Sequence, residues 1–147
     1  MTLRIVFMAW ALLCGLIFAH PARAAVELQP GLWEDTETGS ENGKPVKPTV
    51  SSSCMTPEEA KNPEQAMAAP KEAKEQCKSY DIKRVGDTLT FRMECGAKEF
   101  SMNIAATMIF LTPQHYTGTI KSEISFGGQK LTSDKKLDSK RIGECKK

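Results

Sequence analysis

The stretch that decides the fold is FSMNIAATMIFLTPQHYTGTIKSEISF, residues 100–126. Every even position from Phe100 to Phe110 is apolar, and the odd positions between them are mostly polar. After LTPQH, the large apolar residues again fall on even positions, from Tyr116 to Phe126. A period of two over this length indicates two strands that each bury one face.

These two strands can pair as an antiparallel hairpin whose apolar faces coincide. Setting Phe110 opposite Tyr116 also sets Ala106 opposite Ile120 and Met102 opposite Ile124. A slip of one residue would turn every side chain to the other face, so this agreement selects the register.

The same alternation continues on both sides of this hairpin. A Gly-Asp turn in RVGDTL sets Ile82 opposite Phe91 and Tyr80 opposite Met93, and the GGQ turn sets Ile124 opposite Leu131. We therefore expect a mainly β fold, a curved antiparallel meander that is half-barrel or sandwich-like. The predicted strands lie near residues 31–38, 45–54, 79–85, 88–95, 99–110, 115–126 and 130–139.

Residues 56–76 lack this alternation and predict a short, broken helical insert. Thr56-Pro57-Glu58-Glu59 has the form of a capping box with proline at the first helical position, and Asn62-Pro63-Glu64-Gln65 repeats it. Pro63 and Pro70 should end the turns before them. The apolar residues of the insert are mostly alanine, too small to form a core of their own.

The first 24 residues have the features of a cleaved signal peptide. Arg4 precedes the apolar run Ile5–Ala19, and Ala22 and Ala24 fit an A-x-A cleavage site. The run is shorter than the ~20 residues of a transmembrane helix. The residue before Cys14 is a leucine, which disfavours a lipoprotein signal. We expect a mature single domain, residues 25–147, that is exported and has no membrane span.

Four cysteines remain in the mature chain, and an even number in an exported protein predicts disulfides. They are Cys54, Cys77, Cys95 and Cys145. Of the three pairings, we expect Cys54–Cys77, which would clamp the weak insert, and Cys95–Cys145, which would fasten the last strand.

The charges of the mature chain balance but are unevenly distributed. Removing Arg4 and Arg23 from 20 Lys and Arg leaves 18, equal to the 18 Asp and Glu, which argues against a nucleic-acid binder. The beginning is acidic (Glu27, Glu34, Asp35, Glu37, Glu41), and the tail at residues 133–147 is basic. The acidic beginning could form a carboxylate catalytic site, and the basic tail could contact an anionic component of the envelope. For both ends we expect instead an edge strand that is protected by its charge.

No residue pattern predicts catalysis, a cofactor or a metal. His115 is the one histidine after position 24, no G-x-S-x-G elbow occurs, and no calcium loop or zinc spacing is present. We expect His115 to be a surface residue and the protein not to be an enzyme, with a hydrolase as the last-ranked function.

The aromatic residues suggest ligand binding. Six of them share the inward phase with several methionines: Tyr80, Phe91, Phe100, Phe110, Tyr116 and Phe126. Such a face either packs as an ordinary core or lines a ligand cavity. Trp33 lies outside the stripe, because its phase neighbours are Gly31, Asp35 and Glu37. It would plug an open end of the sheet or stand at a pocket mouth. Trp33 and Tyr116 are therefore the candidate ligand-binding residues.

Several short motifs resemble one family across the mature chain. They are PGLWE (30–34), CMTPEEA (54–60), YTGTI (116–120) and KRIGEC (140–145), with Cys77 and Cys95 between them. Their order and cysteine spacing resemble the bacterial domain-of-unknown-function family 3617. The resemblance implies a periplasmic protein of Gram-negative bacteria and supplies no activity or site residue.

We therefore rank a monomeric, non-enzymatic periplasmic binding module for a small apolar or amphipathic ligand first. The alternative is an envelope protein-interaction or inhibitor protein, for which the uneven charge is the motive.

Overall fold

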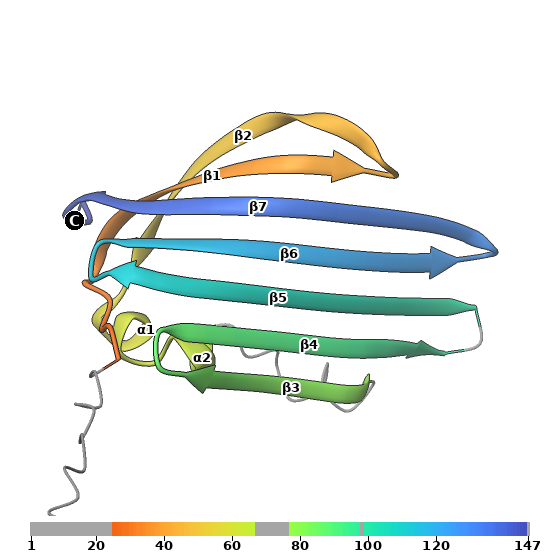
Figure 1. Ribbon diagram of the computed structural model, residues 1–147, viewed down its shortest axis with the longest axis horizontal. Helices are drawn as coiled ribbons and strands as arrows, with labels where there is room; N and C mark the ends of the chain where they lie inside the picture. The colour runs from red at the N-terminus through yellow and green to blue at the C-terminus, as the bar shows by residue number, and fades with distance from the viewer. Residues whose placement is uncertain (1–24, 67–76, 98, 147) are drawn as a thin grey trace, which may run out of the picture.

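A computed structural model describes residues 25–66, 77–97 and 99–146. These residues form one open antiparallel sheet and two short helices (Figure 1). The strands are β1 (Gly31–Glu41), β2 (Lys44–Met55), β3 (Cys77–Val85), β4 (Thr88–Ala97), β5 (Phe100–Thr112), β6 (His115–Phe126) and β7 (Gln129–Gly143). The helices are α1 (Pro57–Lys61) and α2 (Pro63–Ala66). The expected mainly β, antiparallel fold is confirmed, and the sheet is single and open, not a sandwich.

The predicted hairpin registers are confirmed. The observed pairs include Phe110–Tyr116, Ala106–Ile120, Met102–Ile124, Ile82–Phe91, Tyr80–Met93 and Ile124–Leu131. The strands from β3 to β7 therefore form the expected meander, with side chains of even and odd number on opposite faces of β5 and β6.

The sequence predicted an edge strand at each end of the chain, and this prediction is wrong. The strand order is β2-β1-β7-β6-β5-β4-β3, so β1 and β7 pair with each other and are both interior (Figure 1). The edges are β2 and β3. Strand β2 carries Pro45, Lys47 and Pro48 in its first half, residue types that oppose pairing with another strand.

The pairing of β1 with β7 brings the acidic and basic ends of the chain together. Lys135 Nζ lies 3.2 Å from Glu37 Oε2, and both side chains are about two-thirds covered. Glu34 lies opposite Lys140 in the same ladder. Opposite charges across an antiparallel pair stabilise it, and like charges would weaken it. The uneven charge of the sequence is thus matched inside the sheet and does not by itself mark a surface for a charged partner.

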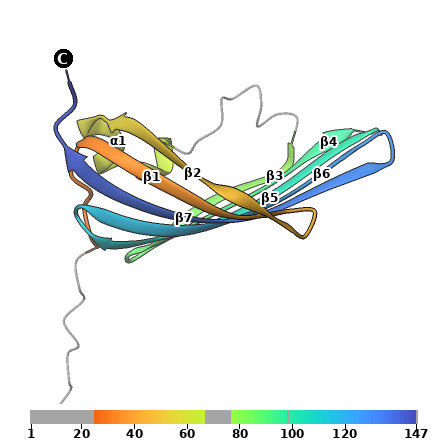
Figure 2. The ribbon, with the colours of Figure 1, turned by 90° about the horizontal axis from the view of Figure 1, so that it is seen from above.

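The helical insert connects the two opposite edges of the sheet. Strand β2 ends at one edge and β3 begins at the other, six strand spacings away, or roughly 29 Å across the ladder. Figure 2 shows α1 and α2 on one face of the twisted sheet. Helices α1 and α2 therefore cover part of one face, which explains why residues with little apolar surface lie against the core.

Helix α1 begins with the predicted capping box. Thr56 Oγ1 accepts a hydrogen bond from the Glu59 amide at 3.2 Å, and Glu59 Oε2 accepts one from the Thr56 amide at 2.7 Å. Proline 57 occupies the first turn. Helix α2 begins at Pro63, directly after Asn62, as the repeated motif predicted. Residues 67–76, where further turns were expected, lie outside the described residues, as do residues 1–24 with the predicted signal peptide.

All four expected cysteines form disulfides, but the predicted pairing is wrong. Cys54 pairs with Cys145, and Cys77 pairs with Cys95. The first bridge crosses β1, because Cys54 and Gly143 both lie beside Leu32 in the ladder. The second links neighbouring strands. Each end of the insert is therefore fastened to its own edge of the sheet, instead of the two ends being fastened to each other.

The core lies at the end of the sheet that the helices cover. Its buried residues are Leu28, Trp33, Ala60, Leu89 and Phe110. Trp33 and Leu89 are each 1% exposed. The Arg84 guanidinium lies 4.8 Å from the centre of the Phe110 ring and donates a hydrogen bond to the Val26 carbonyl, which covers the edge of this core.

The apolar face is buried at one end only. Of the six aromatics expected to point inward, Phe91 and Phe110 are buried and Tyr80 and Tyr116 are half-buried. Phe100 and Phe126, which pair with each other at the far end, are 39% and 69% exposed. For these two the expectation of burial is wrong, because the helices lie over the opposite end of the open sheet.

Within the described ranges, we find no helix with both the length and the apolar character needed to cross a membrane.

Candidate functional site

The candidate site is an apolar cavity of about 230 Å³ where the insert meets the sheet. Strand alternation places Met108 and Phe110 of β5 and Tyr116 of β6 on one face, and the β2–α1–α2 segment lies over them. The apolar lining residues are Leu28, Met55, Pro63, Met108, Phe110 and Tyr116. Ser53, Cys54 and Glu59 complete the lining.

The two candidate residues from the sequence lie together at this site but contribute differently. The Trp33 and Tyr116 rings lie 5.4 Å apart between centres with a 40° tilt. Tyr116 also meets Phe110 edge-on at 6.0 Å. Tyr116 lines the cavity, whereas Trp33 does not and lies behind it, fully buried. Its Nε1 donates to the Gln29 carbonyl at 3.1 Å, so its one polar atom is satisfied.

A small polar group lies beside the aromatic pair. Ser139 is fully buried, and its hydroxyl donates to Asp35 Oδ1 at 2.5 Å. Burial raises the pKa of Tyr116, a hydrogen bond with Ser139 lowers it, and the charge of Asp35 raises it further. The net shift of the Tyr116 pKa is upward, which favours the neutral phenol at neutral pH.

We predict that the Tyr116 phenol ionises above its ordinary pKa of 10.0. Because the folded pKa is raised, the stability it contributes is present below pH 10 and is lost as pH rises through the folded pKa. The measurement is phenolate absorbance against pH in a Tyr80→Phe variant, in which Tyr116 is the one tyrosine left. A midpoint at or below pH 10 would contradict this description of the site.

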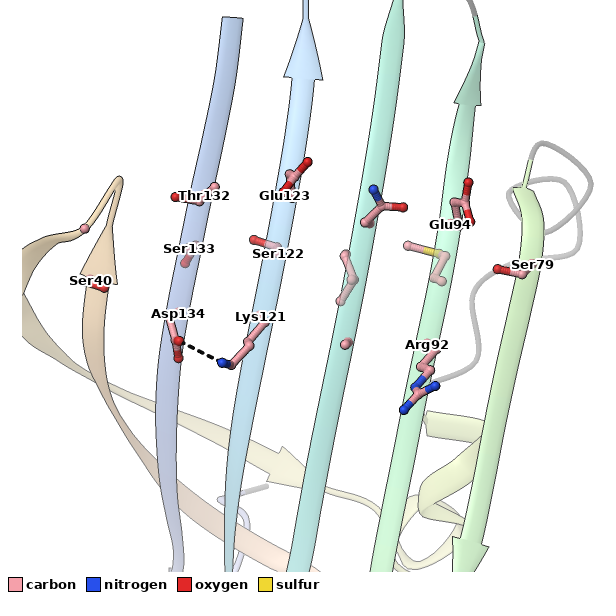
Figure 3. Close-up of a pocket in the computed structure, with 15 residues that line it drawn as sticks. Ser40, Ser79, Arg92, Glu94, Lys121, Ser122, Glu123, Thr132, Ser133 and Asp134 are labelled. Carbon is pink, nitrogen blue, oxygen red and sulfur yellow. Dashed lines mark ion pairs between the residues drawn. The ribbon is translucent and has the colours of Figure 1, made fainter.

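A larger hollow lies mainly among polar side chains, on the face opposite the cavity. Its volume is about 620 Å³, and its lining includes Arg92, Glu94, Lys121 and Asp134 (Figure 3). Its charges largely pair with one another or with neighbouring residues. The three ion pairs are Lys121–Asp134 at 3.3 Å, Lys130–Glu123 at 2.7 Å and Lys78–Glu94 at 3.5 Å. These pairs are exposed and account for the charges without a ligand.

A second hollow on that polar face, of about 390 Å³, is rich in threonine. Its hydroxyl-bearing residues are Thr36, Thr38, Thr107, Thr117 and Thr119, with Lys136 and Asp138 beside them. Threonine on the solvated phase of a strand is the ordinary result of β-propensity.

His115 forms a hydrogen bond with Asp138 and does not belong to the cavity. Its Nε2 lies 3.1 Å from Asp138 Oδ2, and Lys140 lies 2.8 Å from Asp138 Oδ1. Hydrogen bonds from Lys140 and His115 lower the pKa of Asp138. The adjacent Ser139 points to the opposite face of β7, so this pair and that hydroxyl are on different sides of the sheet.

Within residues 25–66, 77–97 and 99–146, no group of three or more His, Cys, Asp or Glu side chains is arranged to hold a metal ion.

The sequence pattern identified Tyr116 but not Met55, which reaches the cavity from the end of β2, nor Glu59 and Pro63, which reach it from the insert. The available signal was the capping box itself, because it fixes where α1 begins. It does not indicate which face of the sheet α1 covers.

A comparison with protein families finds a match to DUF3617, a protein of unknown function, over residues 28–145. No curated protein and no solved structure matches the chain. The match covers most of the chain, including every strand and both disulfides. The chain therefore belongs to the DUF3617 family.

Proposed function

We propose that this protein is a non-enzymatic binding module of the bacterial periplasm that holds a small apolar or amphipathic ligand in the cavity beneath its insert. The observation that carries the proposal is the cavity of about 230 Å³ with six apolar lining residues. Apolar concave sites with few polar groups are the usual form of small-molecule sites.

The size of the cavity limits the ligand. A cavity of about 150 Å³ can hold benzene, and drug-sized sites begin near 300 Å³. At about 230 Å³, this cavity suits a ring with a substituent or a chain of octyl length. Longer chains could continue along the apolar face toward Met102 and Ile124, which are only half-buried.

The lining residues are suited to a ligand that enters and leaves. Met55 and Met108 are half-buried, and methionine side chains adapt to different shapes at low energetic cost. Tyr116 adds an aromatic ring to this wall. None of these groups is a nucleophile paired with a base, which is why we propose binding and not turnover.

The proposed periplasmic location of the protein is supported by its disulfides. Two disulfides are consistent with an oxidising, exported compartment. The predicted signal peptide supports the same location, and the family resemblance points to the periplasm.

Native mass spectrometry of protein released gently from the periplasm tests this proposal. We expect a fraction with added mass that disappears on denaturation. Met108→Asp, which places a charged group on the apolar wall of the cavity, should remove the added mass. The adjacent Ile109→Asp, at a position that is 44% exposed on the other face, should retain it. Protein without added mass that also fails to bind octan-1-ol would refute the proposal.

A further inference from the structure

The charge at the cavity wall points to the kind of head group that a ligand would carry. Of the nine lining residues, Glu59 is the one with a charged side chain. We infer that the cavity prefers amphipathic ligands with a cationic head group, such as an alkyl ammonium, over those with a carboxylate. This inference rests on the proposed binding function and deepens it.

The position of the Glu59 carboxylate is fixed by the capping box. Its Oε2 accepts a hydrogen bond from the Thr56 amide, with 2.7 Å between the two atoms, and the Glu59 amide donates a hydrogen bond to Thr56 Oγ1. An ionised carboxylate has about four acceptor positions on two oxygens, so one hydrogen bond leaves capacity for a ligand. These two bonds with Thr56 also lower the pKa of Glu59, which keeps the group charged at neutral pH.

The basic residues close to the core have other partners. Arg84, which packs on Phe110, donates to the carbonyls of Val26 and Gly86. Arg141, opposite Trp33 in the ladder, donates to the Pro30 carbonyl and pairs with Glu144. Neither lines the cavity. A ligand carboxylate in the cavity would therefore meet an anion at the wall, whereas an ammonium would meet its counter-ion.

Three ligands of equal chain length separate the effect of the head-group charge on affinity from the effect of the apolar contact. Octylamine and octanoate are both ionised at pH 7, and octan-1-ol is neutral at the same length. Isothermal titration of the mature protein should give affinities in the order octylamine, octanol, octanoate. Half-exposed charge pairs contribute modestly, so we expect roughly three- to tenfold between neighbours in this order.

Glu59→Gln is the decisive variant because glutamine can keep the capping bond to Thr56. It should weaken octylamine binding roughly three- to tenfold, strengthen octanoate binding and leave octanol unchanged. Glu58→Gln is the matched control: Glu58 is in the same helical turn, is exposed and does not line the cavity. It should change none of the three affinities.

The outcomes distinguish the two proposals. Octanol binding with no preference for the amine, or a preference that survives Glu59→Gln, would overturn the cationic head group and leave the binding function standing. Failure of all three ligands to bind would overturn both.

Discussion

A variant with Cys54 and Cys145 both replaced by serine should lose about 4.6 kcal/mol of unfolding free energy, the largest change we expect from a single disulfide. The bridge closes a loop with a sequence separation of 91 residues, and the entropy it removes from the unfolded chain grows with loop length. It also fastens the edge strand β2 across β1 to the end of the chain. Urea unfolding followed by far-ultraviolet circular dichroism measures the loss.

The second disulfide provides the matched comparison. Cys77 and Cys95 are separated by 18 residues, so replacing both should cost about 3 kcal/mol. Peptide mapping under non-reducing conditions should link Cys54 to Cys145 and Cys77 to Cys95. A peptide that joins Cys54 to Cys77, or an equal loss in the two double variants, would contradict the connectivity described above.

Trp33→Ala should lower the unfolding free energy by about 3–5 kcal/mol, the usual range for deleting a large buried aromatic. The side chain is 1% exposed, packs on Tyr116 and belongs to the core formed with Leu28, Ala60 and Phe110. Because Trp33 is the one tryptophan after the predicted signal peptide, unfolding should be followed by circular dichroism and not by fluorescence.

Trp33→Phe separates the packing of the ring from its hydrogen bond. It keeps an aromatic ring against Tyr116 but removes the Nε1 donor to the Gln29 carbonyl, so the loss should be about 1–2 kcal/mol. Unchanged melting of Trp33→Ala together with lost ligand binding would show instead that Trp33 is a contact for the ligand.

The part of the fold that the sequence predicts well is local. A period of two assigns each strand its buried face, and a short turn fixes how neighbouring strands align, so pairs such as Phe110–Tyr116 and Ile82–Phe91 could be predicted. The capping box at Thr56 predicted the start of α1 for the same reason, because its partners lie three residues apart.

The long-range part could not be predicted in this way. Alternation does not state which strands of different hairpins meet, so β1 and β7 were expected at the edges although they pair with each other. The disulfide error has the same origin. Cys54 and Cys77 bracket the insert in sequence, yet they end at opposite edges of the sheet. Complementary charge at the two ends of the chain was the available signal.

Of the residues that line the candidate site, the sequence could predict only those that the sheet contributes. Tyr116 and Met108 could be assigned to the apolar face because alternation reports which side chains share a face. Glu59 and Pro63 reach the site because α1 and α2 lie over one face of the sheet, and nothing local in the insert encodes that placement. Trp33 looked misplaced for the same reason: it has few apolar neighbours in its own strand, but several come from the N-terminal segment, α1 and β6.

A crystal structure with 8-bromooctan-1-ol tests the binding proposal most directly, because the anomalous scattering of bromine locates the ligand without assumptions about its pose. We expect one bromine site at or within the cavity lined by Met108, Phe110 and Tyr116, and none there in Met108→Asp crystals prepared in the same way. Ile109→Asp crystals should keep it. Bromine found only elsewhere on the molecule at saturating ligand, or a cavity filled by protein side chains, would contradict the account.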